Sequence, residues 1–289
     1  MFEMLVSPRE AEKKPERLFF VGLLYATLSL LIVNLIFLKN PTFSSHAGIL
    51  LITFSVLFAL PFMYFLLRVS EFKEVVYGKN RTLFKEHSKA ILALLFLFLG
   101  FVVAFTFFNL ILPPENVGKI FNSQIEEFCR VNMPSQLNEC LEQYNISPIG
   151  ITGNVVSIQN EVSSVFINNL YVLLFVLIFS LAFGAGAIFI LAWNASVIGT
   201  AIGLIVKTSL ANAGVLVAYI IHGIPEITAY FVAALAGGII SIAIIRKDWG
   251  RGKSKNIFID FVSLMIIALI ILLIAAFLEV YISPAFYQS

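Results

Sequence analysis

Charged residues are scarce in this 289-residue chain. Only 12% of its residues are Asp, Glu, Lys or Arg, and 60% are hydrophobic, whereas soluble domains usually carry about 25% charged residues. This composition excludes a soluble globular protein. The formal net charge of +2 is too small to indicate a nucleic-acid partner.

Motifs for catalysis and for cofactors are also missing. The chain has three histidines and two cysteines, and it contains no H-E-x-x-H sequence, serine nucleophile motif, glycine-rich phosphate loop or dinucleotide fingerprint. The sequence therefore predicts no metal and no cofactor, and it favours a protein that is not an enzyme.

Long apolar runs dominate instead, without the alternating pattern of a membrane β-barrel. A bilayer core about 30 Å thick needs roughly 20 apolar residues per helix. We therefore predict an all-α fold, a polytopic membrane bundle that forms a single domain over residues 1–289. Clear spans are Leu18–Leu38, His46–Leu67, Ala90–Leu112, Phe166–Ala192 and Ile257–Tyr281. The interrupted stretch Trp193–Ile245 supplies a short fifth span and a sixth, which makes about seven crossings.

Basic residues indicate the topology. Arg9, Lys13, Lys14 and Arg17 precede the first span, and the segments 68–89 and 246–255 contain six and five basic residues. Lys and Arg concentrate in cytoplasmic loops. The protein is therefore expected in the cell membrane, with a cytoplasmic N-terminus and an extracytoplasmic C-terminus.

The segment 113–163 is predicted to be an extracytoplasmic loop insertion. It is acidic, with six glutamates against Lys119 and Arg130. It also holds both cysteines, Cys129 and Cys140, and an oxidising exterior favours a disulfide between them.

The sequence "HGIPE" interrupts the penultimate apolar stretch. Pro225 removes a backbone donor and clashes with the carbonyl of Ile221, and Gly223 relaxes the backbone. The sequence therefore predicts a broken helix near residues 211–226, with a half-helix before "HGIP" and a full span after it.

Two interpretations of the polar residues at this break remain open. His222 and Glu226 either cap a kink or form a polar intramembrane site, since ionisable groups in a membrane usually face the bundle interior or water. The candidate partners in that site are Asn168, Asn169, Asn194 and Asn212. His222 and Glu226 are spaced to share a metal, but no third ligand is evident.

Small residues recur at spacings of three or four along three helices, which permits close helix packing. The predicted packing positions are Gly186, Gly199, Gly203, Ala229, Ala233 and Gly237. Such rows also suit contacts between copies in a homo-oligomer.

Three stretches of the C-terminal half resemble the stage II sporulation protein M family of integral membrane proteins: "FINNLYVLL", "FGAGAIFILAWNASVIGTAIG" and "HGIPEITAYFVAALAGG". In spore-forming bacteria the resemblance implies a membrane component that works with cell-wall-degrading partners during engulfment.

Three functions follow as hypotheses. The first is a non-catalytic membrane component that organises or recruits other envelope proteins in the bilayer. The second is a transporter or channel for a small polar solute or ion, with its site at the broken helix. The third is an intramembrane hydrolase that uses His222 and Glu226.

Overall fold

The computed structural model describes residues 14–77, 83–132, 136–146, 162–183, 188–208, 213–245 and 254–287. Within these residues every regular element is a helix, which confirms the predicted all-α class. In chain order the elements are α2 (Arg17–Ile32), η1 (Val33–Phe37), α3 (Pro41–Ser44), α4 (Ala47–Tyr77), α5 (Leu83–Ile111), α6 (Pro114–Ile120), α7 (Asn122–Asn132), α8 (Leu137–Gln143), α9 (Val162–Phe183), α10 (Ile188–Thr208), α11 (Ala213–Ile245), α12 (Ser254–Phe277), η6 (Leu278–Ile282) and α13 (Pro284–Tyr287). The elements η1 and η6 are π-helices.

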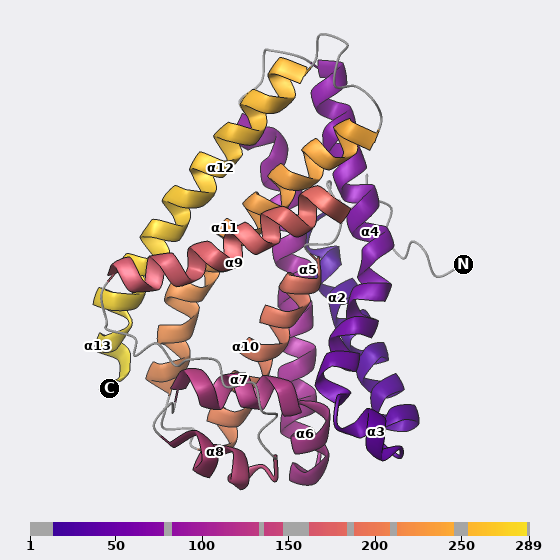
Figure 1. The fold of residues 1–289 in the computed structure, drawn as a ribbon, viewed down its shortest axis with the longest axis vertical. Helices are drawn as coiled ribbons and strands as arrows, with labels where there is room; N and C mark the ends of the chain where they lie inside the picture. Colours follow the sequence, from indigo (N-terminus) through magenta and orange to yellow (C-terminus); the bar gives the residue numbers. More distant parts are fainter. Residues whose placement is uncertain are drawn as a thin grey trace.

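Seven of these helices account for the predicted membrane crossings. Six of the described helices are long and apolar enough to cross a bilayer, and α4 contributes a shorter apolar stretch, Ala47–Met63. Helices α6, α7 and α8 gather at one end of the bundle, here named the cap end, whereas α4 ends and α12 begins at the opposite end (Figure 1). The chain is therefore a multi-pass membrane protein with a helical cap at one end.

The predicted boundaries differ from the observed ones in the middle of the chain. The expected span Phe166–Ala192 is divided, because α9 ends at Phe183 and α10 begins at Ile188. Gly186 lies between them, outside the described residues. The fifth span is consequently a full helix of 21 residues and not the short one that the sequence predicted.

The predicted helix break is wrong. Helix α11 runs as one α-helix of 33 residues with Pro225 inside it. A proline inside a helix costs about 3 kcal/mol, but unwinding the helix would leave several backbone groups without partners in lipid, each at a cost of several kcal/mol. The carbonyl that loses its helical donor at Pro225 is that of Ile221, and the Thr228 hydroxyl donates to the next turn's Ile224 carbonyl at 2.7 Å.

The segment 113–163 contains the cap, defined here as α6, α7 and α8. Asn122 and Gln124 of α7 fasten the cap to the first turn of α4. The Asn122 side chain accepts a bond from the Gly48 N–H at 3.2 Å and donates to the Ser45 carbonyl at 2.8 Å, while Gln124 donates to the Gly48 carbonyl at 3.2 Å. The described part of the predicted loop is thus folded into helices that pack on the end of the bundle.

Glycines bring three helix pairs into close contact. A Cβ atom added at Gly22 of α2 would overlap the Leu97 carbonyl oxygen of α5, and one added at Gly100 of α5 would overlap the Phe19 carbonyl oxygen of α2. Gly199 and Gly203 lie against α5, and Gly237 lies against Ser180 and Leu177 of α9. These close approaches fix α2, α5 and α10 as one group of packed helices and α9 with α11 as a second.

Replacing Gly100 and Gly223 by alanine should change stability in opposite directions. We expect Gly100→Ala to lower the free energy of unfolding by about 1–3 kcal/mol, because overpacking forces two backbones apart. Gly223→Ala should raise it by about 0.5–1 kcal/mol, because its added Cβ meets no atom within 4 Å and alanine suits a helix interior better than glycine. Thermal unfolding in detergent measures both, and a Gly100→Ala protein as stable as the wild type would contradict the assigned packing.

Candidate functional site

Helix α11 carries three polar side chains in its half nearer the cap end. His222, Glu226 and Tyr230 follow one another at intervals of four residues, so they share one face of the helix. That face lies against the C-terminal part of the chain, since α11 packs along α12, η6 and α13.

The carboxylate of Glu226 has one neutral and one acidic neighbour. The Tyr230 hydroxyl donates a hydrogen bond to Glu226 Oε1 at 2.7 Å, and the Tyr230 side chain is fully buried. Glu279 of η6 lies close enough to interact electrostatically with Glu226 and Tyr230. Two carboxyl groups, 53 residues apart in sequence (279 − 226), therefore lie within electrostatic range of each other in the bundle.

His222 connects the same face to the end of the chain. Its Nδ1 atom lies 2.8 Å from Ser283 Oγ, and the Ser283 hydroxyl donates to the Leu278 carbonyl at 3.2 Å. The hydrogen bond between these two side chains joins α11 to the residue that follows η6. The imidazole thus holds the π-helix η6, which carries Glu279, against α11.

The π-helical turn positions these groups. The end of α12 changes at Leu278 into the five-residue η6, and Pro284 begins α13. A π-helical turn widens the backbone by about one residue per turn and frequently occurs at functional sites. Glu226, Glu279, Tyr230, His222 and Ser283 together form what we call the intramembrane polar cluster.

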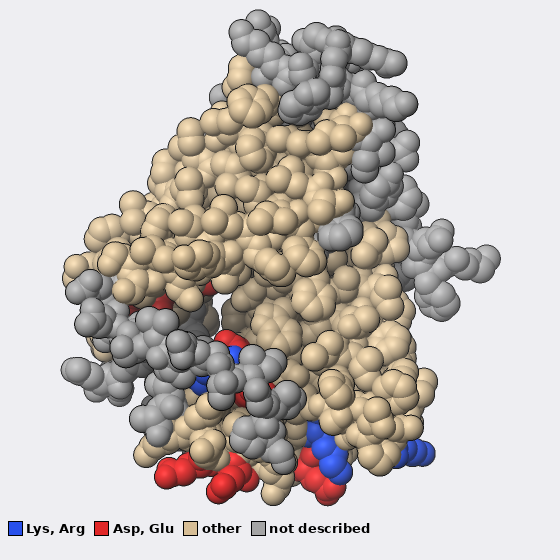
Figure 2. Space-filling model, viewed as in Figure 1, with Lys and Arg blue, Asp and Glu red and all other residues tan. Residues whose placement is uncertain are grey.

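No basic side chain neutralises the two acids among the residues that the structure describes. The ion pairs found there lie in the cap and join Lys119 to Glu115 and Arg130 to Glu126 and Glu127. Figure 2 shows a hollow between the upper helices and the cap, and both acidic and basic atoms lie at its border. The polar cluster therefore holds two acidic side chains where lipid offers no compensation.

The asparagines that were predicted as partners in the polar site do not gather around His222 and Glu226. Asn194 donates to the Ile190 carbonyl of its own helix at 2.8 Å, Asn168 is exposed on α9, and Asn169 is buried on α9. Asn212 lies outside the described residues. The hydrogen bonds that define the polar cluster do not include the three that are described.

The small residues predicted for packing line the interior. Ala229 and Ala233 are fully buried in α11, and Gly237 faces α9. Pro225 lies within α11 next to Glu226.

Sequence reasoning missed Glu279, Tyr230 and Ser283. Glu279 carried a usable signal, because it is an acidic residue close to the end of an otherwise apolar span, and such residues usually face protein or water. Tyr230 and Ser283 carried none, since neither residue type is unusual near the end of a membrane helix.

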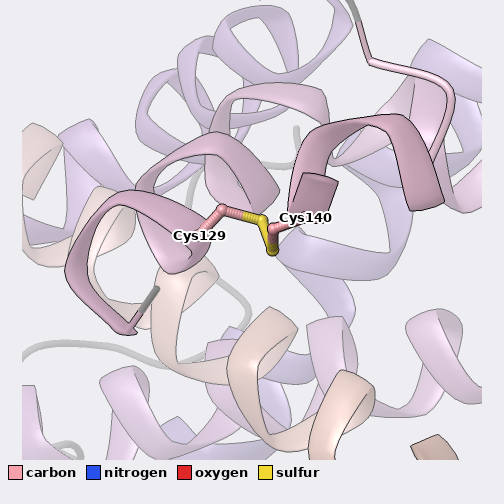
Figure 3. The surroundings of a disulfide bond; sticks show 2 residues. All are labelled: Cys129 and Cys140. Carbon is pink, nitrogen blue, oxygen red and sulfur yellow. A yellow bond between two sulfur atoms is a disulfide. The ribbon is translucent and has the colours of Figure 1, made fainter. Parts of the chain in front are cut away.

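The two cysteines are bonded to each other. Cys129 of α7 and Cys140 of α8 form a disulfide with their Cα atoms 5.9 Å apart (Figure 3). Both side chains are buried. The disulfide closes the cap across residues 133–135, which lie outside the described part of the chain.

A cluster of three or more His, Cys, Asp or Glu side chains that could hold a metal ion does not occur among the described residues. The polar cluster contains two carboxyl groups, one imidazole and two hydroxyl groups, and none of its side chains is a thiolate.

The fold and the site together define a class, that of multi-pass helical membrane proteins with a polar cluster inside the bundle. The family model described as Stage II sporulation protein M matches residues 89–284. The chain belongs to this family, and the match covers α5 through the start of α13, including the whole polar cluster.

A curated relative comes from Methanocaldococcus jannaschii and is described as an uncharacterized protein. It is 31% identical over 148 residues, which cover 48% of this chain and 82% of the relative. No solved structure matches the chain.

Replacing Tyr230 by phenylalanine should destabilise the protein. The substitution removes the hydroxyl that donates to Glu226 and leaves a partly buried carboxylate short of one partner, which costs about 1–3 kcal/mol. Tyr171→Phe is the matched control, because Tyr171 is 68% exposed on the bundle surface. Unfolding midpoints in detergent compare the two, and equal midpoints for both variants would exclude a stabilising role for the Tyr230 bond.

Proposed function

We propose that this protein moves a small cation, in the simplest case a proton, across the bilayer by way of the intramembrane polar cluster. The observation that carries the proposal is that Glu226 and Glu279 lie within electrostatic range of each other, while the ion pairs among the described residues lie in the cap. A buried carboxylate must be paired or neutralised. The free-energy cost of leaving it ionised rises when a second carboxylate lies within electrostatic range. A mobile cation lowers this cost.

The position of the cluster supports the same function. Glu226 lies in the candidate span Ile220–Ser241 and Glu279 in the candidate span Ile257–Phe286. Intramembrane acids in polytopic proteins mark ion pathways and proton relays. Glu226 and Glu279 would bind the cation, Tyr230 would orient Glu226, and His222 with Ser283 would hold η6 in place.

The basic segments indicate the orientation of the protein in the membrane. Residues 68–89 and 246–255 carry eleven basic residues (6 + 5) and join helices at the end opposite the cap. Basic loops lie on the cytoplasmic side, so we infer that the cap end is extracytoplasmic and that the cluster is nearer to the exterior. The N-terminus would then be cytoplasmic and the C-terminus extracytoplasmic.

Flux through the polar cluster can be measured in vesicles. Purified protein in lipid vesicles should dissipate a pH gradient or a monovalent-cation gradient, followed by an internal fluorescent dye. Glu226→Gln and Glu279→Gln should each reduce this flux to the level of protein-free vesicles, because each removes a negative charge at the site.

Glu139→Gln is the matched control for this experiment, since Glu139 is exposed on α8 in the cap and should leave flux unchanged. Wild-type vesicles as tight as protein-free ones would exclude the transport function. Flux that survives both cluster substitutions would exclude this cluster as its site.

A second candidate function is the organisation of envelope partners without catalysis. The specific observation that favours it is the cap, which is closed by the Cys129–Cys140 disulfide and bonded to α4. Its glutamates Glu139 and Glu142 are exposed. A folded surface held rigidly at the end of the bundle suits recognition better than a loop, and the family resemblance implies work with envelope partners.

Removing the disulfide separates the two candidates. A double Cys129→Ser and Cys140→Ser variant should loosen the cap by about 2–4 kcal/mol and abolish co-purification of envelope proteins from native membranes, while cation flux persists. A wild-type protein that always purifies alone would exclude partner organisation. A free-thiol assay on the unfolded, unreduced wild-type protein checks the premise, and two reactive thiols would contradict the disulfide.

A further inference from the structure

Two polar side chains are buried without hydrogen-bond partners where α5 meets α10. Asn109 of α5 and Thr200 of α10 have no exposed surface. The amide oxygen and nitrogen of Asn109 and the hydroxyl of Thr200 have no hydrogen-bond partner among the described residues. Buried polar atoms in folded proteins are nearly all paired, either with protein groups or with ordered water. These atoms therefore require a partner other than the side chains and backbone around them.

Neither side chain uses the carbonyl that its own helix offers. Other hydroxyl and amide side chains in this protein donate to the carbonyl four residues earlier, as those of Ser55, Thr228 and Asn194 do. Asn109 and Thr200 lie inside α5 and α10, where the same acceptor is within reach, yet they make no such bond. Local pairing with the backbone is therefore not what satisfies them.

Gly203 of α10 leaves the space that the Asn109 side chain occupies. A Cβ atom added at Gly203 would lie 2.7 Å from each of Cβ, Cγ and Oδ1 of Asn109. At Gly100 and Gly199 the atoms that an added Cβ would meet include backbone atoms of the neighbouring helix, so those two glycines serve contact between backbones. Gly203 instead accommodates a polar side chain within the interface.

Thr200 lies on the helical turn next to this contact. Gly203, which contacts Asn109, follows Thr200 by three residues, and residues three apart are neighbours on a helix surface. Close by, the Thr106 hydroxyl of α5 donates to the Gly199 carbonyl of α10 at 3.1 Å. This part of the α5–α10 interface is therefore polar, although both helices are apolar enough to cross a bilayer.

The interface lies at the cap end of the bundle. Asn109 is two residues before the last residue of α5, Ile111, where the candidate span Ile91–Ile111 also ends. The ring of Phe121, between α6 and α7, contacts the ring of Phe105, one turn before Asn109, and α7 packs against α10. The unpaired atoms are thus close to the aqueous phase along the chain, and the cap packs beside them.

The unpaired atoms select the chemistry of the ligand. The Asn109 amide presents an unpaired acceptor, Oδ1, together with an unpaired donor, Nδ2. A cation would pair with the acceptor alone and an anion with the donor alone, whereas water both donates and accepts. Buried waters typically make about three hydrogen bonds to otherwise unpaired groups. We propose that Asn109 and Thr200 bind ordered water between α5 and α10, in the space that Gly203 provides.

Bound water would join the two helices by hydrogen bonds at the end of the bundle that carries the cap. The site does not depend on the proposed cation function, because none of its residues belongs to the polar cluster. Its test uses no ion gradient, so either proposal can fail while the other stands.

Radiolytic labelling tests the proposal. A short X-ray pulse converts bound water into hydroxyl radicals, which oxidise the side chains beside it, and the products are mapped by mass spectrometry after digestion. Phe105 is the reporter and Phe231 of α11 the dry reference, since both are fully buried. We expect Phe105 to be oxidised several-fold faster than Phe231 in wild-type protein in lipid vesicles. Equal rates for the two rings would overturn the proposal.

Variants that remove the polar groups provide the second measurement. Asn109→Leu replaces the amide by an apolar group of similar shape and should lower the oxidation rate of Phe105 to that of Phe231. Thr200→Val removes a hydroxyl with little change of shape and should lower the rate in part. Thr200→Val carries the test alone if Asn109→Leu does not fold.

Thr53→Val is the matched control, because the Thr53 hydroxyl of α4 is already bonded to the Ile49 carbonyl at 2.9 Å. This variant should leave the oxidation of Phe105 unchanged. Oxidation of Phe105 that stays at the wild-type rate in the folded Asn109 and Thr200 variants would show that these side chains hold no water, and the proposal would then be wrong.

Discussion

Lipid provides no hydrogen bonds, and this constraint shapes most of the structure. Backbone groups must be satisfied inside helices, so α11 continues through Pro225 although the local sequence disfavours it. Hydroxyl side chains follow the same rule. Ser29, Ser55 and Thr228 each donate to the carbonyl four residues earlier, so that no hydroxyl among these three faces hydrocarbon unpaired. The polar side chains of α11 obey it as well, since Glu226 accepts a hydrogen bond from Tyr230 and His222 shares one with Ser283.

Close helix packing supplies the rigidity that the polar cluster requires. Hydrophobic burial does not drive helices together within lipid, so association depends on van der Waals contact at short distance. Gly22 and Gly100 allow α2 and α5 to touch through their backbones, and Gly237 does the same for α11 and α9. The helix that carries Glu226 is thereby held at a fixed distance from its neighbours, and Glu279 approaches it from a position set by α12.

Much of the fold was predictable from the sequence, but less of the site was. Apolar runs of membrane length gave the number of crossings, and the acidic segment correctly suggested the disulfide between Cys129 and Cys140. The predicted helix break at Pro225 was wrong. Helix propensity does not include the cost of backbone groups that lack hydrogen-bond partners in lipid. Glu226 was identified as a polar residue in a span, yet its neighbour Glu279 was not, because contact between residues so distant in sequence depends on how α11 packs along α12.

The attachment of the cap has a mechanical consequence. Asn122 and Gln124 hold the cap through the backbone of Gly48, at the first turn of α4, and α4 packs against α2, α10 and α11. A force applied to the cap would therefore be transmitted through α4 to the centre of the bundle. The cap is not attached by a flexible linker at this point, and the disulfide between α7 and α8 would limit its deformation.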